Sequence, residues 1–465
     1  MSIKKTILYS ILTLLLIGLG YAFNYAYNFG TVGTAYSAKI LCSCVFVADR
    51  SEESGVEQEL FNYNGFIDTQ VDYENKSVTA SISGMAEKTA VYREGLGCVL
   101  VNGIPAQELQ NQGIDLPKPI YPMQDTLAWP IGDLDTLPIP QGVDQAKIEK
   151  ALDKIFTEDN PELIKNTRGV VVVYKGKIVA ERYGEGFDEN TPLLGWSMTK
   201  SVTNSLVGLL VKDGKLTLEE KAPVTEWQDS ADPRNAITLD QLMRMSSGLD
   251  FEEEYFGYTD ATKMLFGSKS ASGYAVQTLL RTEPDGEWYY SSGTTNIISQ
   301  IVRDQFDSDL DYWHFPYNRL FHKLGMNSAI METDPSGTFV GSSFMYATTR
   351  DWARYGLLYL NDGVWNGERI LPKGWAEYSA TPTPKSDRGG YGAQFWLNAG
   401  EPGNPENRRF PNAPADMYFP SGFEGQNVVI IPSRDVVIVR LGLTYNRDAW
   451  NLGDFVADVL EGIPE

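Results

Sequence analysis

The chain has 465 residues, of which 42% are hydrophobic and 12% aromatic, and it carries a formal net charge of −22 at pH 7. This composition excludes a disordered chain and predicts a well-packed globular protein with one large domain or a few smaller ones. The negative charge would repel phosphate groups, which argues against nucleic acid or anionic lipid as a partner.

Residues 1–30 combine a positively charged start with a long apolar run. Lys4 and Lys5 precede a stretch rich in leucine and isoleucine that reaches Ala22, and aromatic residues recur between positions 21 and 29. The pattern is typical of an export signal, either removed or kept as a transmembrane anchor with aromatic residues at the interface. We therefore predict an exported protein, periplasmic or extracellular, and leave both fates of the segment open.

The three cysteines, Cys42, Cys44 and Cys98, lie in the first quarter of the chain. In an oxidising compartment we expect Cys98 to pair with Cys42 or Cys44, and three buried free thiols are the alternative. Closing a loop of this size would stabilise the fold by about 4 kcal/mol. Two neighbouring thiols and a remote one, with no histidine nearby, make a poor zinc site, and we expect no metal and no cofactor.

The N-terminal third is predicted to be a small β-rich region, residues 40–105, followed by a linker. Short strand-like runs occur at 45–47, 77–82 and 97–101. Prolines and turn residues dominate residues 106–142, which we expect to form an extended linker on the surface of the main domain.

Residues 143–463 show strand patterns at both ends and helical patterns between them. A helix around 148–155 precedes strand runs at 169–174 and 177–183, which form a hairpin signal. Strand runs return at 426–431 and 436–441, before a helix over about 450–460. We therefore expect an α/β (α+β) domain in which an antiparallel sheet, flanked by the terminal helices, faces a helical subdomain.

Ser197-Met198-Thr199-Lys200 opens an amphipathic helix and offers a nucleophile and a base together. Residues three apart on a helix share a face, so Lys200 should lie beside Ser197. A serine hydroxyl needs a neighbouring base, and a lysine can serve if burial near a helix N-terminus disfavours its cation by about 4–5 kcal/mol. The two histidines, His314 and His322, lie together far along the chain, and we assign them to helix packing. The simpler interpretation of Ser197 alone is a helix N-cap.

A second element, Trp288-Tyr289-Tyr290-Ser291-Ser292-Gly293, supplies a phenol and a hydroxyl. Ser197-x-x-Lys200 followed by this Tyr-Ser element resembles the serine β-lactamase and penicillin-binding protein superfamily. The chain is most similar to the class C β-lactamase branch with its esterases, and especially to the 6-aminohexanoate-oligomer hydrolases. Residues 237–249 and 421–426 support the resemblance, which covers about residues 145–460.

The resemblance implies a serine hydrolase that cleaves a small-molecule amide or ester through an acyl-enzyme on Ser197. Lys200 and Tyr290 would act as general base and acid. The backbone N–H groups of Ser197 and Phe423 would form the oxyanion hole. Ser292 stands where many relatives have asparagine.

The third superfamily motif falls on Pro420-Ser421-Gly422, so the lysine that grips a carboxylate in β-lactamases is missing. This departure disfavours antibiotic hydrolysis and favours an uncharged substrate. Ser421 and Gly422 would line the substrate site, and Tyr255 resembles the loop that contacts substrate in the related hydrolases. Tyr255 with Glu252–Glu254 also fits a solvated acidic loop.

Two alternatives from other functional classes remain at this point. One is a D-amino-acid peptidase or β-lactamase-like enzyme of the cell envelope. The other is a non-catalytic exported binding module that keeps the fold without the chemistry. Tyr290 alone also fits core packing, and Ser292 either bonds Lys200 or satisfies a turn. The sequence leaves the oligomeric state open.

Overall fold

An antiparallel seven-stranded sheet, built from the two ends of the predicted hydrolase domain, forms the centre of the structure. The structure is a computed structural model, and it describes residues 3–134 and 138–465. The strand order is β12-β13-β15-β16-β5-β6, with β14 paired to β15 at one end. The strands are β5 (Thr167–Tyr174), β6 (Lys177–Tyr183), β12 (Trp396–Leu397), β13 (Tyr418–Phe419), β14 (Ser421–Gly422), β15 (Gln426–Ile431) and β16 (Val436–Gly442). Both predicted strand pairs are confirmed, and β16 joins them by pairing with β5.

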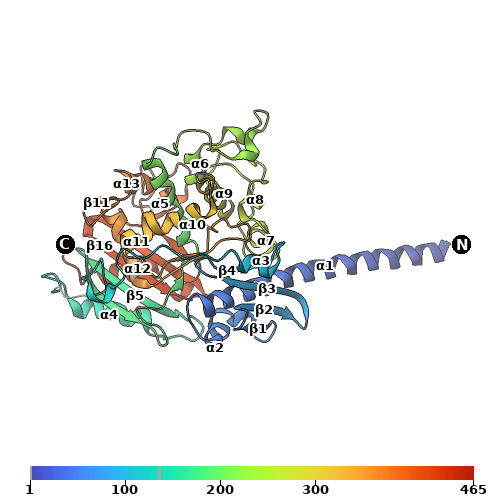
Figure 1. Cartoon of the computed structure of the whole chain (residues 1–465), viewed down its shortest axis with the longest axis horizontal. Coiled ribbons are helices and arrows are strands. Elements are labelled where there is room, and N and C mark those ends of the chain that lie inside the picture. Colours follow the sequence, from blue (N-terminus) through green and yellow to red (C-terminus); the bar gives the residue numbers. More distant parts are fainter. Residues whose placement is uncertain (1–2, 135–137) are drawn as a thin grey trace.

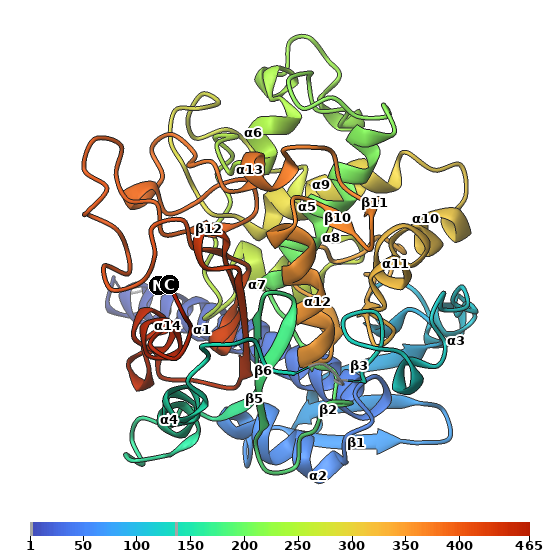
Figure 2. The same cartoon turned by 90° about the vertical axis from the view of Figure 1, so that its left-hand side faces the viewer.

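Helices cover both faces of this sheet (Figure 2). Alternate valines of β5 enter different cores, because successive side chains of a strand point to opposite faces. Val170 and Val172 pack under α4 (Gln145–Phe156) and α14 (Leu452–Leu460), the predicted terminal helices. Val171 and Val173 belong to the larger core that includes α12 (Thr349–Leu360). The fold class predicted from the sequence is therefore confirmed.

The chain segment between β6 and β15 forms a helical layer. It contains the buried helix α5 (Met198–Lys212), which is the helix predicted after Ser197. Around it lie α6 (Leu239–Met243), α7 (Asp260–Gly267), α8 (Ala271–Ala275), α9 (Ser292–Arg303), α10 (Asp309–Pro316), α11 (His322–Leu324) and α13 (Trp375–Ser379). Two small sheets complete the layer, one from β7 (Leu193–Leu194), β8 (Ile330–Met331) and β9 (Met345–Ala347), the other from β10 (Val364–Trp365) and β11 (Glu368–Arg369).

The N-terminal region is one long helix packed on a four-stranded sheet. Helix α1 spans Ile3–Phe46, and its first part projects from the body while its second part lies against the sheet (Figure 1). The strands β1 (Asp68–Asp72), β2 (Ser77–Ile82), β3 (Met85–Arg93) and β4 (Gly97–Leu100) follow one another in the sheet. Short helices α2 (Glu52–Ser54) and α3 (Ala106–Gln110) complete this region.

The predicted strand at 45–47 is wrong, because these residues end α1 and its following turn. The inner face of the helix, including Ala38, Leu41 and Val45, is buried in the core, and this packing outweighs the β-propensity of the valines. The runs at 77–82 and 97–101 are confirmed as β2 and β4. Residues 1–2 of the predicted export segment and residues 135–137 of the predicted linker lie outside the described residues.

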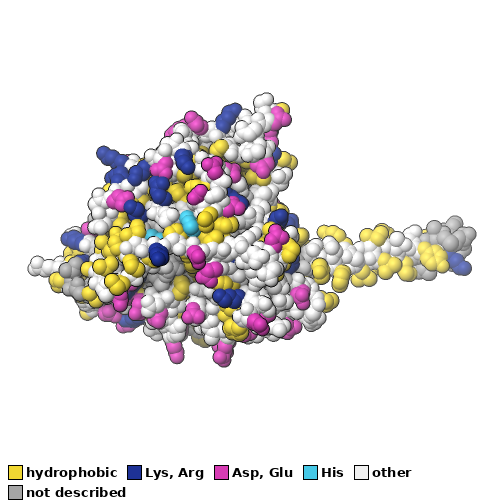
Figure 3. Space-filling view, viewed as in Figure 1, with side chains coloured by type: hydrophobic (Ala, Val, Ile, Leu, Met, Phe, Trp, Pro, Cys, Tyr) yellow, Lys and Arg dark blue, Asp and Glu magenta, His cyan; other side chains and the backbone are white. Residues whose placement is uncertain are grey.

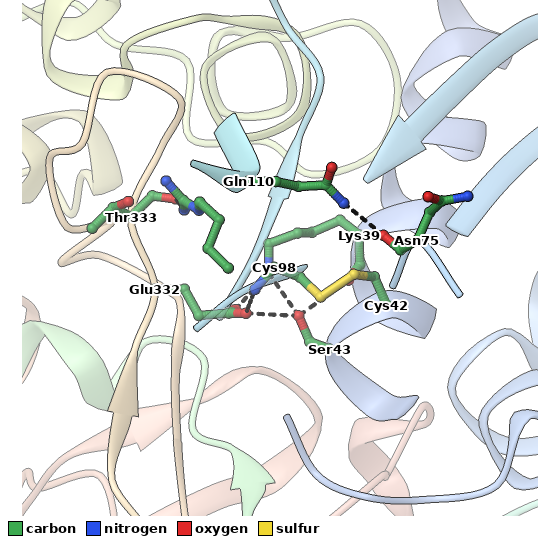
Figure 4. Close-up of a disulfide and its surroundings, with 9 residues drawn as sticks. Lys39, Cys42, Ser43, Asn75, Cys98, Gln110, Glu332 and Thr333 are labelled. Carbon is green, nitrogen blue, oxygen red and sulfur yellow. Dashed lines mark hydrogen bonds and ion pairs between the residues drawn. A yellow bond between two sulfur atoms is a disulfide. The ribbon is translucent and has the colours of Figure 1, made fainter. Parts of the chain in front are cut away.

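A disulfide and a buried ion pair fix α1 to the rest of the fold (Figure 4). Cys42 bonds Cys98 of β4, whereas Cys44 is a buried free thiol. Lys39 lies 2.5 Å from Glu332, and the Glu332 carboxylate also accepts from the Cys98 backbone N–H at 2.7 Å. The second half of α1 is therefore part of the folded body.

Candidate active site

Ser197 occupies the N-cap position of α5, but its hydroxyl makes no capping hydrogen bond. Its φ of −65° and ψ of −7° are helical, whereas a residue whose side chain caps a helix usually has an extended backbone. The preceding residue, Trp196, has a φ of +48°, which is unusual for a non-glycine residue. Such backbone strain is typical of functional sites.

Lys200 lies one turn along α5 and is 1% exposed. Its Nζ is 3.1 Å from Ser197 Oγ, 2.9 Å from Ser292 Oγ and 3.0 Å from the carbonyl oxygen of Ser342. The Ser342 carbonyl can only accept, and the Ser292 hydroxyl donates its own proton to Glu253 at 2.6 Å. A neutral lysine amine therefore donates both of its hydrogens to these two partners. Its lone pair is left facing Ser197.

Burial also prepares Lys200 to act as a base. Desolvation lowers the pKa of its amine from 10.5 to about 8, while the Glu253 carboxylate acts in the opposite direction and raises it. A substantial neutral fraction thus exists at mildly alkaline pH. A lysine can serve as the base only if its pKa is lowered, and in the structure burial lowers the pKa of Lys200.

Tyr290 lies beside this pair. The Lys200 Nζ is 4.8 Å from the centre of the Tyr290 ring, and the Tyr290 hydroxyl hydrogen-bonds the Ser197 side chain. Burial and then the Glu253 carboxylate raise the pKa of Tyr290, so this phenol stays protonated where the Lys200 amine is neutral. In this arrangement the Lys200 amine can accept a proton and the neutral Tyr290 hydroxyl can donate one.

Glu253, which the sequence predicts to lie in a solvated acidic loop, instead contacts Ser292 of the candidate site. Its carboxylate accepts from the Ser292 backbone N–H at 2.7 Å and from the Ser292 hydroxyl at 2.6 Å. The Tyr255 hydroxyl also donates to it and lies 2.8 Å from Ser292 Oγ. Of that loop, Glu252 and Glu254 are exposed, whereas Glu253 is half-buried at the N-terminus of α9. No local pattern distinguishes the three glutamates.

The strand β14 and the following Phe423 lie against Gly195 and Trp196, the two residues that precede Ser197. A Cβ on Gly422 would stand 2.2 Å from the carbonyl oxygen of Gly195, so only glycine allows this approach. The Phe423 ring meets Trp196 edge-on at 5.9 Å between ring centres. Glu424, which follows Phe423, has a φ of +62° and hydrogen-bonds the Trp196 side chain. The two backbone N–H groups predicted to form the oxyanion hole, those of Ser197 and Phe423, thus each adjoin a residue with a left-handed backbone conformation.

The remaining predicted residues fall into two groups. Ser421 and Gly422 form β14 at the edge of the site, and the 43%-exposed Tyr255 stacks on Phe423 at 6.5 Å. His314 bonds the Asp115 carbonyl and His322 is buried against Tyr317, so neither contributes to the site. Within residues 3–134 and 138–465, no cluster of His, Cys, Asp or Glu has an arrangement that could hold a metal ion.

Replacing Glu253 by glutamine should shift the activity profile to lower pH. The carboxylate raises the pKa of Lys200, so its removal favours the neutral amine, while a carboxamide oxygen can still accept from Ser292. We expect the midpoint of the rise in kcat/KM, about pH 8 in the wild type, to fall by about half a pH unit. Rates on a small ester across this range measure it. Glu252→Gln, an exposed neighbour, should leave the midpoint unchanged, and an identical midpoint in both variants would contradict the role of Glu253.

The fold and the Ser-x-x-Lys helix define a serine hydrolase related to β-lactamases and penicillin-binding proteins. The family model described as Beta-lactamase matches residues 162–454, and the chain belongs to this family. The resemblance predicted from the motifs is therefore confirmed.

Individual relatives agree with this assignment. The chain is 26% identical to the 6-aminohexanoate-dimer hydrolase of Paenarthrobacter ureafaciens over 301 residues, which cover 59% of this chain and 72% of the relative. A Bacillus anthracis structure assigned as a 6-aminohexanoate-dimer hydrolase superposes with a TM-score of 0.53 at 22% identity, covering 65% of this chain and 81% of that chain. A penicillin-binding protein homologue from Caulobacter crescentus has a TM-score of 0.51 at 13% identity, covering 70% and 99%. The structural relatives share the fold.

Proposed function

We propose that the protein hydrolyses an uncharged amide or ester through an acyl-enzyme on Ser197. The observation that carries the proposal is the contact of 3.1 Å between Lys200 Nζ and Ser197 Oγ, with the other hydrogen bonds of Lys200 turning its lone pair toward the serine. Lys200 takes the Ser197 proton as Oγ attacks the substrate carbonyl carbon. The backbone N–H groups of Ser197 and Phe423 stabilise the negative charge that develops on the carbonyl oxygen.

The second half of the reaction returns the same proton. The bond to the leaving nitrogen or oxygen breaks as that atom receives the proton from Lys200, directly or through the Tyr290 hydroxyl. A water molecule then attacks the acyl-enzyme and gives its proton to Lys200. Ser197 regains a proton as the acid is released. The chain's own groups supply every proton transfer.

Two features favour an uncharged substrate. The third motif, Pro420-Ser421-Gly422, lacks the lysine that would pair with a substrate carboxylate. The Glu253 carboxylate lies two hydrogen bonds from Lys200 and would repel an anionic group placed beside Ser292. The similarity to a 6-aminohexanoate-dimer hydrolase is consistent with a linear amide as the substrate.

Covalent labelling tests the proposed function. A fluorophosphonate should add one equivalent to the protein, and digestion should locate it on the peptide that contains Ser197. Labelling should vanish in Ser197→Ala. Failure of fluorophosphonates and activated esters to form any adduct would contradict the proposal and favour the binding module. Cleavage of D-Ala-D-Ala peptides but not of simple esters would favour the peptidase.

A further inference from the structure

The projecting half of α1 is apolar, and among the described residues its side chains from Tyr9 to Tyr27 are exposed, so that contact with the body begins near Phe29. Side chains from Tyr9 to Phe29 are exposed with the sole exception of the half-exposed Asn28, and hydrophobic residues run along this part of the helix (Figure 3). The segment belongs to a helix that contains an 18-residue stretch with a mean hydropathy of 1.4. At 1.5 Å per residue it is about 30 Å long, the thickness of the hydrocarbon core of a bilayer.

The body presents exposed apolar side chains around the point where α1 enters it. Three segments contact the helix there: Phe256 meets Phe29 with 5.5 Å between ring centres, Ile67 approaches Gly33, and the Ala86 carbonyl accepts from Thr34. Each segment carries a strongly exposed apolar residue. These residues are Phe66 (78% exposed), Met85 (56%) and Phe256 (79%), and we call them the apolar collar. Water is a poor solvent for such a ring, whereas a membrane interface accommodates it.

The apolar collar continues directly into the active site. Phe256 follows Tyr255, whose hydroxyl is 2.8 Å from Ser292 Oγ and whose ring stacks on the 48%-exposed Phe423. From the other side, Tyr36 of α1 stacks on Trp196 with 6.2 Å between ring centres. Tyr36 lies two helical turns beyond Phe29, a rise of about 10 Å. Measured along α1, Trp196 beside Ser197 therefore lies about 10 Å from the collar residue Phe256, which contacts Phe29.

We propose that α1 is retained as a membrane anchor, that the mouth of the Ser197 site faces the same bilayer, and that the substrate is an amphiphilic ester or amide whose hydrocarbon tail stays in the membrane. This proposal rests on the proposed function. The exposed rings of Phe423 and Tyr255 offer an apolar path between the collar and Ser197. Because the chain has a net charge of −22, an uncharged or zwitterionic lipid surface is the matching partner.

The proposal is tested with the full chain in phosphatidylcholine vesicles and two p-nitrophenyl esters that differ only in the length of the acyl chain. p-Nitrophenyl palmitate partitions into the bilayer, and p-nitrophenyl acetate stays in water. The double variant Phe66→Ser/Met85→Ser removes two of the three collar side chains and leaves Phe256, which follows Tyr255 of the site, in place. We expect it to lose at least about fivefold in the rate on the palmitate ester and to keep its rate on the acetate ester within about twofold. Leu310→Ser on α10, also an exposed apolar side chain, should change neither rate.

An unchanged palmitate-to-acetate ratio in the collar variant, or an equal loss in Leu310→Ser, would overturn the proposal. The intact mass of the membrane-bound protein provides a second readout, because a chain that begins after Ala22 would have lost the anchor and would also overturn it. Wild-type protein that hydrolyses neither ester contradicts the proposed function itself. A protein that cleaves the acetate ester but whose palmitate rate does not depend on the collar would keep the proposed function and overturn only the membrane proposal.

Discussion

Ser197→Ala is expected to lower kcat by about four orders of magnitude or more while the fold stays intact. The hydroxyl is the proposed nucleophile, and the acyl-enzyme cannot form without it. Its hydrogen bonds reach Lys200 and Tyr290, and it caps no helix, so the free energy of unfolding should change by less than about 1 kcal/mol. Steady-state rates on a small ester and urea unfolding curves measure the two quantities.

Ser205→Ala is the matched control on the same helix. The Ser205 hydroxyl is buried and lies 2.9 Å from the Tyr355 hydroxyl and 2.8 Å from that of Tyr359, away from the site. This variant should show the opposite result, a loss of about 1–2 kcal/mol in stability with activity retained. A Ser197→Ala protein with wild-type turnover would eliminate the proposed mechanism.

Lys200→Met is expected to lower kcat/KM by about three to four orders of magnitude and to remove the alkaline rise in activity. In the wild type the base must be neutral, so the rate should increase as pH rises through about 8, the pKa of Lys200. Methionine fills a similar volume but accepts no proton. Lys212→Met, at the other end of α5, should keep both the rate and the pH profile.

The same substitution has a signature in the pH dependence of stability. The pKa of Lys200 is about 8 in the folded protein and 10.5 for an unperturbed lysine, so the unfolded chain binds the extra proton between these values. The free energy of unfolding of the wild type should therefore rise with pH between about 8 and 10.5, by about 3 kcal/mol in total. Below pH 8, burial of the protonated Lys200 destabilises the fold by this full amount. Unfolding curves of Lys200→Met should lack this rise. Parallel curves for both proteins would show that Lys200 is not desolvated in the folded state.

Local sequence was sufficient wherever the functional arrangement lies within one element. The pairing of Ser197 with Lys200 follows from their spacing on a helix, and runs of valine and isoleucine bounded by turn residues located the strands β5, β6, β15 and β16. The Ser-x-x-Lys and Tyr-Ser elements together identified the family. These features depend on neighbours in the chain, which a sequence displays directly.

The choice between Cys42 and Cys44 could not be made in this way. Residues two apart on a helix point about 200° away from each other, so only one of the two thiols can face β4. Which one does so depends on how α1 rotates against the sheet. The mistaken strand at 45–47 has the same origin, since the burial of α1 in the core decided its conformation.

The sequence by itself determined the fold family and predicted the candidate nucleophile and base, because these depend on periodicity and short motifs. Only the tertiary structure decided the electrostatics of the site. Glu253 reaches Ser292 from 39 residues away, and the Ser342 carbonyl that orients the Lys200 amine is 142 residues from it. The tertiary structure also placed the collar of Phe66, Met85 and Phe256 around α1. Such groups meet through the packing of remote segments, and no local pattern encodes that contact.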